Sequence, residues 1–573
     1  MSATNPVDEV VERALAAQLR RRPVDATFIG VHDHDERLPD WSRAALATAD
    51  DEMASDVAAL AQALPTPADD AGLRDDPTRL DAALLGDALT LQRAELASGH
   101  GVRGNPALWT GEAIFSIVAL VTRDFAPLDE RVAFARARLA AIPAFLAEAR
   151  ATLADALPSP WVARALRECE GATILLGAGV RRWAGGRLER EAADAACAFT
   201  DFARWLGERP AAADSTMSCG ADRLDLLLAR GHRCTRPRGE LLAEARARLV
   251  EERARLDELA SEVPGSWPAV QAALAEHHPA PDDYLPAFAR TWEACRARAI
   301  DAGVVTWPDW PIRYTVYPDA TRDAAPHLYY LHYRSPAPFD PYTVHDYVVP
   351  ALGGDPGAQL RVWNHAAIKL NHVVHHGAIG HHVQNWHAYH RAPTRVGRIA
   401  AVDCASRIAL FSGGTMAEGW ACYATALMEE LGFLTPLERV SEQHSRVRFL
   451  VRAVGDLAFH AGEMTFDELG GLHEREAGLA PEAARGEAAK CAMFPGTASM
   501  YWIGTQGIID LRASLAASAA ARGEPFALGD FHDELLGHGS IPVPLVARMM
   551  TREARSSPRA RGGSVALRGD PGR

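Results

Sequence analysis

The chain has 573 residues, of which 48% are hydrophobic and 23% are charged, and its formal net charge is −14 at pH 7. This composition is that of a globular protein with a sizeable core, and the negative charge argues against nucleic acid or an anionic membrane as the main partner. No run of about 18 apolar residues occurs, so we expect no membrane-spanning helix.

The first residues and the cysteines bear on the cellular location. The segment MSATNPVDEVVERALAAQ is polar and amphipathic and lacks the regions of a secretory signal peptide. Eight cysteines are scattered without a C-x-x-C pair, which is typical of reduced thiols rather than of a disulfide framework. We therefore expect a cytoplasmic protein, and the sequence leaves its oligomeric state open.

The N-terminal part begins with a predicted helix at residues 7–21 and a predicted loop, DATFIGVHDHDERLPDWS, at 25–42. The His32-Asp33-His34-Asp35 run in this loop could bind a metal or line the entrance to a distant site. We favour a solvated turn with local side-chain hydrogen bonds.

From about residue 42 to residue 300 the chain is rich in Ala, Leu, Arg and Glu, with apolar residues three and four apart. This spacing predicts an array of amphipathic helices with solvated charged faces. The segment LLGAGVRRWAGG at 175–186 lacks the third glycine and the strand context of a dinucleotide loop, so we interpret it as a helix break. No P-loop or G-x-S-x-G elbow supports a nucleotide-binding or serine-hydrolase function.

The composition changes at residues 303–350, where aromatic and β-branched residues and prolines dominate. This texture predicts one or two short strands and loops, and strands beside a metal site can hold an extended substrate by β-augmentation. Helices resume afterwards. The prediction is a mainly α-helical array with a small β element, in two regions that form one continuous fold and a disordered tail: 1–300, 301–555 and 556–573.

Histidines concentrate in one stretch of the second region. Seven of the 22 histidines fall in HVVHHGAIGHHVQNWHAYH, residues 372–390. Imidazole is the commonest side-chain metal ligand, and packing alone does not explain the clustering because each buried imidazole needs hydrogen-bond partners. The stretch therefore predicts a metal site.

The spacing leaves two pairings of these histidines open. Asp355-Pro356 is a good helix start, and in an unbroken helix positions seven apart share a face, which pairs His375 with His382. Glycines at 377 and 380 could instead allow a bulge that brings His381 round. The H-E-x-x-H motif is absent because Ile379 occupies its second histidine position.

A later helix, SGGTMAEGWACYATALMEELG at 412–432, carries Glu418 in its first turn. That carboxylate could complete a His/His/Glu set with an open coordination position. Thr415-x-x-Glu418 is also a capping box, in which the glutamate needs no metal. Both interpretations stay open on the sequence.

Two further helices carry polar candidates. Arg452, Asp456 and His460 are spaced four apart, as in an ion-pair ladder or a row of ligand or substrate contacts. Tyr501 could donate a hydrogen bond to a developing oxyanion and Arg512 could hold a substrate carboxylate, although packing would explain each alone.

Six segments, in order along the chain, carry a family resemblance: VDATFIGVHDHDERLPDWS, HHGAIGHHVQ, AEGWACYATALMEELG, RAVGDLAFHAGEMTFDE, FPGTASMYWIGTQGIIDLR and FHDELLGHGSIPVPLV. The chain resembles the bacterial domain-of-unknown-function family 885, whose members look like distant helical relatives of the gluzincin metallopeptidases. The resemblance implies a mostly α-helical fold with a central zinc-peptidase-like cleft. It also implies metal ligands among His375, His381, His382 and Glu418, with Tyr501 nearby.

The chain departs from this family pattern at the centre of the motif. The family segment reads like H-E-G-x-P-G-H-H, whereas here His376 replaces the glutamate and Ile379 the proline. Thr425 stands where the family tends to have an acid. In a zinc peptidase the replaced glutamate takes a proton from water. Its loss argues against ordinary peptide hydrolysis but does not remove the expected metal.

These observations predict a metal-dependent hydrolase acting on a small amide or peptide-like substrate. One divalent metal, most simply zinc, would be held by His375, His381 or His382, and Glu418, with His376 as base, Tyr501 at the oxyanion and Arg512 on the substrate. A histidine-rich site also suits iron, copper or manganese and a lyase or oxidative reaction. A catalytically inactive homologue is the third hypothesis.

Overall fold

The computed structural model describes residues 6–64, 73, 75–263, 265–328, 337–341, 344–399 and 413–556. It is 71% helix and 2% strand, which confirms the predicted mainly α-helical class. Among the described residues, no helix has the length and apolar character needed to cross a membrane. The tail predicted at 556–573 lies, beyond its first residue, outside the described part of the chain.

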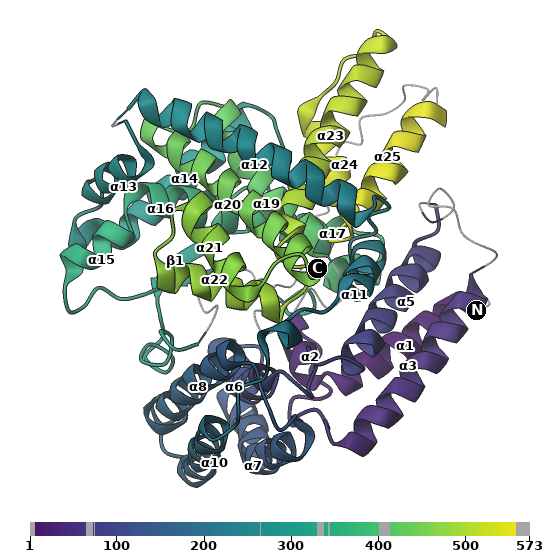
Figure 1. The fold of residues 1–573 in the computed structure, drawn as a ribbon, viewed down its shortest axis with the longest axis vertical. Coiled ribbons are helices and arrows are strands. Elements are labelled where there is room, and N and C mark those ends of the chain that lie inside the picture. Colours follow the sequence, from purple (N-terminus) through teal and green to yellow (C-terminus); the bar gives the residue numbers. More distant parts are fainter. Residues whose placement is uncertain are drawn as a thin grey trace, which may run out of the picture.

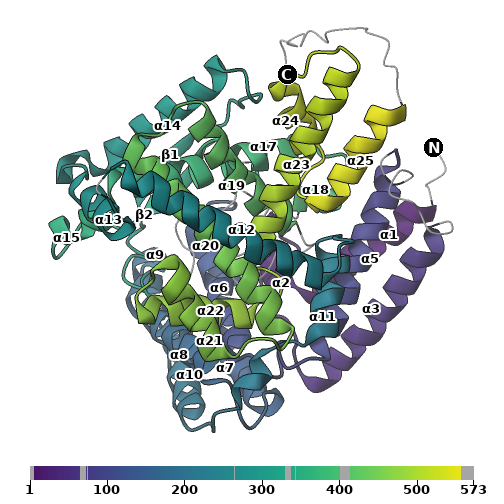
Figure 2. The same cartoon turned by 45° about the horizontal axis from the view of Figure 1, so that its top comes forward.

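The N-terminal helices form two groups that lie side by side (Figures 1 and 2). The first group is α1 (Pro6–Arg21), α2 (Pro23–Ile29), α3 (Arg43–Ala63) and α5 (Pro77–Leu96). The second is α6 (Pro106–Thr122), α7 (Leu128–Thr152), α8 (Ser159–Ile174), η1 (Leu175–Gly179), α9 (Val180–Ala184) and α10 (Glu189–Gly207). The starts of α5 and α6 follow from sequence, because an Asp or Asn cap precedes a proline in the first turn.

The next stretch holds the helices and strands that lead to the histidines. It comprises η2 (Asp214–Met217), α11 (Ala221–Leu226), η3 (Leu227–Gly231), α12 (Arg238–Ser261), α13 (Trp267–Glu276), η4 (Pro281–Asp283), α14 (Tyr284–Asp301), β1 (Ile312–Val316) and β2 (His345–Val349). The strands pair in parallel, with Tyr314 opposite Tyr347. The prediction of one or two short strands between 303 and 350 is confirmed.

The C-terminal part is again helical. It comprises α15 (Pro356–Val362), α16 (His365–Ala367), η5 (Ile368–Gly377), α17 (His381–Arg391), α18 (Arg395–Ile399), α19 (Gly414–Glu430), α20 (Pro436–His460), α21 (Phe466–Ala477), α22 (Pro481–Met493), α23 (Met500–Ala521), α24 (Leu528–Gly537) and α25 (Val543–Ser556). Its first helix is capped as expected, since the Asp355 side chain accepts from Ala358 N.

Two hydrophobic cores hold these helices together, and each core includes residues from both sides of residue 300. The larger core runs from Val11 to Met550. The smaller one joins α11, α12 and α13 to α20 and α21, and α12 packs along α20. Figure 1 shows α12 lying beside α20 in the upper half of the molecule. Helices from both predicted regions therefore share their buried surfaces.

One N-terminal prediction needs correction, because residues 25–29 belong to α2 and not to a loop. The helix break predicted within 175–186 is found at the end of that segment, since the helix continues as the π-helix η1 and then α9 and ends at Gly185, whose φ is 62°. A side chain at Gly179 would collide with the Ala320 carbonyl. That glycine therefore allows close packing of two backbones and does not form a dinucleotide loop.

The His32–Asp35 run is an ion-pair network and not a solvated turn. Nδ1 of His32 lies 2.7 Å from Asp35 Oδ2, and Nε2 lies 2.8 Å from Asp340 Oδ1. Asp35 is fully buried, and the imidazole stacks on Phe125 at 3.9 Å. Burial would lower the pKa of His32, but the two carboxylates outweigh it and raise that pKa to about 9.

This network predicts a pH-dependent contribution to stability. A raised folded-state pKa means that the contribution is complete below the unfolded value of about 6.5 and is lost as pH rises through about 9. We expect His32→Gln to lower the thermal unfolding midpoint at pH 6.5 and to lower it much less at pH 10. His34→Gln in the same loop is the control, since no described residue forms an ion pair with its ring. A midpoint difference that is the same at both pH values would contradict the assignment.

Candidate metal centre

The histidines meet because the helix that carries them changes its pitch and then breaks. The π-helix η5 ends at Gly377, and α17 begins at His381. In the turn between them, Gly380 N donates to the Val374 carbonyl at 2.9 Å. A side chain at Gly380 would collide with the His375 carbonyl, so this tight turn requires glycine.

Indole groups from two neighbouring helices hold this turn. Trp292 Nε1 on α14 donates to the Gly377 carbonyl, and Trp420 Nε1 on α19 donates to the Ile379 carbonyl, each at 2.8 Å. Ile379 is fully buried between these contacts. The position of the histidines therefore depends on residues far away in the sequence, and no pattern within 372–390 indicated these two tryptophans.

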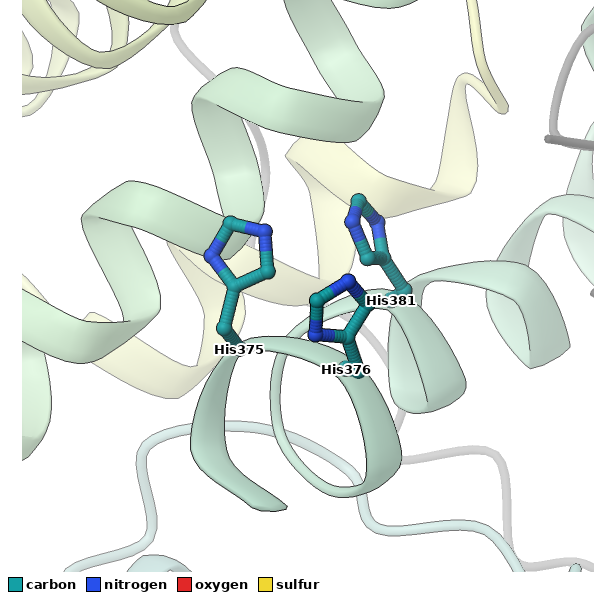
Figure 3. Close-up of side chains that lie close together, drawn as sticks. All are labelled: His375, His376 and His381. Carbon is teal, nitrogen blue, oxygen red and sulfur yellow. The ribbon is translucent and has the colours of Figure 1, made fainter. Parts of the chain in front are cut away.

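His375, His376 and His381 form a compact cluster. Each offers one ring nitrogen, and these three atoms lie within 4.8 Å of one another. Figure 3 shows the three rings on the same side of the η5–α17 turn. The rings of His375 and His381 are perpendicular, with centroids 4.9 Å apart. The bulged pairing of His375 with His381 is thus the one that the structure adopts.

Glu418 on α19 brings a carboxylate to this cluster. Its Oε2 lies 3.3 Å from Nε2 of His375 and 3.7 Å from Nε2 of His381. The three side chains are 16%, 12% and 9% exposed, respectively. Oε2 is buried, yet it has no hydrogen bond of normal geometry to any described residue. A buried carboxylate oxygen facing two imidazole nitrogens fits the donor set of a divalent metal site.

The alternative role of Glu418 as a helix cap is not observed. Helix α19 starts at Gly414, and no side chain caps it. The Thr415 hydroxyl accepts a hydrogen bond from Val543 N at 3.1 Å instead of from its own helix. Glu418 therefore lies beyond the first turn. Next to it, Gly419 contacts Gly504, so α19 and α23 cross at close range beside the cluster.

His382 is the predicted ligand that the structure places elsewhere. Its Nε2 donates to the Trp310 carbonyl at 2.7 Å, and its ring stacks on Trp310 with centroids 5.0 Å apart. Because His381 and His382 are adjacent on α17, their side chains point about 100° apart around the helix axis. The choice between them depended on where α17 begins, which the sequence left open.

His376 is oriented by the backbone. Its Nδ1 donates to the Asn371 carbonyl at 2.6 Å, which leaves the lone pair on Nε2. A hydrogen bond of this kind fixes the tautomer and the ring orientation of metal-binding and catalytic histidines alike.

The electrostatics of the cluster favour the forms that bind cations. Burial, the His381 charge and the nearby Arg452 lower the pKa of His375 despite the opposing effect of Glu418, and burial and the neighbouring imidazoles hold the pKa of His376 well below its usual value. Burial would raise the pKa of Glu418, but His375 and His381 outweigh it and hold that pKa well below its usual range. Neutral imidazoles and an ionised carboxylate are the forms that metals require.

Tyr501 lies on α23, one helical turn before the crossing with α19. Its ring stacks on Phe449 at 5.2 Å, and the Arg452 guanidinium lies 5.2 Å from the ring centroid. Arg452 forms two hydrogen bonds to Glu487, of 2.9 and 2.7 Å. Arg452 thus lies over the Tyr501 ring, and its charge also contributes to the lowered pKa of His375. Glu487 was not anticipated, because PEAARGEAAK looks like a solvated helix.

Arg512 does not join the cluster. Its guanidinium makes two bonds of 3.1 and 2.9 Å to Glu430 and one of 3.1 Å to the Tyr423 hydroxyl. Glu430 is twelve residues after Glu418 on α19, about 18 Å along the helix axis. The predicted substrate contact is therefore an interhelical ion pair remote from the histidines.

Of the predicted Arg452–Asp456–His460 ladder, the structure retains the pair of Asp456 with His460, whose Nε2 lies 3.6 Å from Asp456 Oδ1, whereas Arg452 pairs with Glu487. Asp456 is fully buried and accepts from Gly496 N and Ser499 N. His460 accepts from Cys219 N and lies 3.1 Å from the Cys491 carbonyl. Asp456, His460 and Cys491 lie close enough to hold a metal, but both ring nitrogens of His460 are engaged, so we interpret them as a hydrogen-bonded core.

The two adjacent histidines give a matched test of the ligand set. We expect His381→Gln to weaken zinc binding on the order of 100-fold or more, because it removes a ring nitrogen facing Glu418. His382→Gln should leave zinc affinity within a few-fold and instead lower the thermal midpoint. Titration against a competing chelator measures both. Equal loss of zinc affinity in the two variants would contradict the geometry.

Comparisons with known proteins are consistent with this architecture. A family model described as "Bacterial protein of unknown function (DUF885)" matches residues 23–550. A comparison with curated proteins gives no match.

Two solved structures share the fold. One, from Shewanella oneidensis, is described as a lipoprotein of unknown function and has a TM-score of 0.72 at 19% identity, covering 95% of this chain and 99% of its own. The other, from Colwellia psychrerythraea, is described as a lipoprotein and has a TM-score of 0.74 at 15% identity, covering 96% of this chain and 99% of its own. At these identities the likeness concerns the fold alone. The family match spans nearly the whole sequence, and the chain belongs to the bacterial family of unknown function DUF885.

Proposed function

We propose that the protein is a metal-dependent hydrolase acting on a small amide or peptide-like substrate. The observation that carries this proposal is the buried Glu418 Oε2, 3.3 Å from His375 Nε2 and 3.7 Å from His381 Nε2, without a hydrogen bond to a described residue. Two imidazoles and one carboxylate form the ligand set of many hydrolytic zinc sites, which leave a coordination position open for water or substrate.

In this proposal His375, His381 and Glu418 hold the metal, most simply zinc. A divalent ion bound there would polarise a substrate carbonyl and lower the pKa of an attacking water. The small exposure of the three side chains supports this role, because electrostatic effects are stronger where bulk water is excluded.

His376 would serve as the general base. Its Nδ1 proton is committed to the Asn371 carbonyl, so Nε2 carries the lone pair that accepts the proton from water. Its lowered pKa keeps the ring in this neutral form at neutral pH. In the related peptidase pattern a glutamate has this position, so His376 would replace a carboxylate base by an imidazole.

Tyr501 would steady the oxygen that becomes negative in the transition state. It lies one helical turn from the contact between Gly504 and Gly419, next to Glu418. The guanidinium of Arg452 over its ring stabilises negative charge at the phenol. Arg512 has no part in this proposal.

The cytoplasmic location stays a prediction. Both solved relatives are described as lipoproteins.

One observation favours a second candidate function. One ring nitrogen of His376 belongs to the same compact group as a nitrogen of His375 and one of His381. If all three imidazoles and Glu418 were ligands, the site would suit iron, manganese or copper as well as zinc. Such a site would favour lyase or oxidative chemistry on a small metabolite.

Replacing His376 separates these two functions. As a general base, His376→Gln should retain the metal and lose about 10²–10⁴-fold in kcat on a panel of dipeptides and N-acyl amino acids. As a ligand, the same variant should lose metal affinity. His390→Gln on the exposed end of α17 is the control. His376→Glu, which restores the carboxylate of the related pattern, should keep or gain peptidase activity.

Metal content provides the direct test of hydrolysis. Protein purified without added metal is expected to contain close to one zinc per chain, and removal of the zinc by a chelator should abolish hydrolysis and lower the thermal midpoint, because the bound metal stabilises the folded state. Re-addition of zinc should restore both. Stoichiometric iron or copper would favour the second candidate function, and the absence of any tightly bound metal would favour a catalytically inactive homologue.

A further inference from the structure

A second site lies at the N-terminal end of the molecule, apart from the histidine cluster. A cavity of about 500 Å³ opens between α1, α3, α5 and residues 37–41. Its volume is within the range of small-molecule sites, about 300–1,000 Å³. All of its lining residues fall between Arg20 and Leu108, so it shares no side chain with the metal centre. We call it the N-terminal cavity.

One part of the cavity wall is formed by apolar side chains that are packed into the hydrophobic core. Leu46 and Met53 on α3 and Leu108 on α6 are buried core residues that also line the cavity. Trp41 lines it too, and its ring packs edge-on against Trp109 and at an angle against Phe145, with centroids 5.1 and 5.3 Å away. This wall can bury a hydrocarbon or aromatic body of a ligand.

The remaining wall is rich in arginine. Arg20, Arg21, Arg22 and Arg37 line the cavity, against only three carboxylates from Asp40, Glu52 and Glu95. The lining therefore concentrates guanidinium groups in a chain whose net charge is −14, and three guanidiniums and three carboxylates remain when Arg22 is set aside. Arg22 is neutralised locally by the buried Asp25, to which its Nε donates.

The positive charge of Arg20 and Arg21 is only partly compensated. Both guanidiniums form ion pairs with the same oxygen, Glu52 Oε2, at 3.3 Å for Arg20 and 3.1 Å for Arg21. The side chain of Arg21 is 13% exposed, and its Nε is buried without a hydrogen bond to a described residue. Asp56 is 3.9 Å away and also faces Arg13. Burial lowers the pKa of Arg21, which reflects the cost of its charge.

We propose that the N-terminal cavity binds a small organic anion with an apolar body, of the fatty-acid or aromatic-carboxylate class. The carboxylate of the ligand pairs with Arg20 and Arg21, and its apolar body lies against Trp41, Leu46 and Met53. An anion at this position supplies the counter-charge that the shared Glu52 does not. This site does not depend on the metal centre or on the proposed hydrolase function.

Calorimetric titration with three probes tests the ligand class on the full chain. Decanoate, below its micellar concentration, should bind saturably with one site per chain. Decanol, which has the same body without the charge, should bind at least tenfold more weakly, because a charge-assisted hydrogen bond is lost. Sulfate, a charge without an apolar body, should not displace decanoate. Equal binding of decanol, equal competition by sulfate, or absence of saturable decanoate binding would each overturn the proposal.

Variants locate the site. Arg21→Met removes the charge and keeps the apolar stem, and Ala49→Phe fills the cavity while leaving the arginines in place; each should weaken decanoate binding at least tenfold. Arg13→Met is the matched control, because Arg13 lies on the same helix near Asp56 but outside the lining. If Arg21→Met does not fold, as judged by its thermal unfolding, Arg20→Met replaces it. Unchanged affinity in Ala49→Phe would place the bound decanoate elsewhere and overturn the assignment.

Discussion

The carboxylate of Glu418 faces two imidazoles in a largely buried part of the molecule. The packing of the surrounding helices brings these three groups together. A buried carboxylate is unfavourable unless positive charge or hydrogen bonds compensate it. Here His375 and His381 approach the same oxygen, at 3.3 and 3.7 Å. The two imidazoles hold the pKa of the acid well below its usual range, and burial outweighs the opposing carboxylate and lowers the pKa of His375, so both groups favour the protonation states of a metal-binding set.

Close approach of backbones makes this contact possible. Gly380 allows the turn that brings the two histidines to one side, and the contact of Gly419 with Gly504 lets α19 and α23 cross beside the cluster. Trp292 and Trp420 then hold the turn through its carbonyl groups. Since these groups come from α14, α17, α19 and α23, the site depends on the packing of the whole C-terminal part and would not survive in an isolated helix pair.

The N-terminal cavity shows the converse arrangement of charge. At the candidate metal centre two imidazoles face one carboxylate, whose pKa is held well below its usual range, so the group of donors suits a cation. At the cavity Arg20 and Arg21 share one oxygen of Glu52, and the nearby Asp56 also faces Arg13, so three guanidiniums are set against two carboxylates. Both are partly buried, where an uncompensated charge is costly. Each local imbalance indicates the sign of the group that would bind, a cation in the first case and an anion in the second.

The sequence by itself determined the mainly α-helical class and the presence of one or two short strands between 303 and 350, because these depend on periodicity and on residue type. It also indicated His375, His376 and Glu418 as candidate site residues, with Glu418 left open between a ligand and a helix cap, and the structure brings Glu418 to 3.3 Å from His375. It did not determine that His381 joins the cluster while His382 turns to Trp310, that Thr415 binds Val543 instead of capping its helix, or that Arg512 pairs with Glu430. Only the tertiary structure decided these, because each depends on where a helix begins and on which distant backbone lies beside it, and neither is encoded in local spacing.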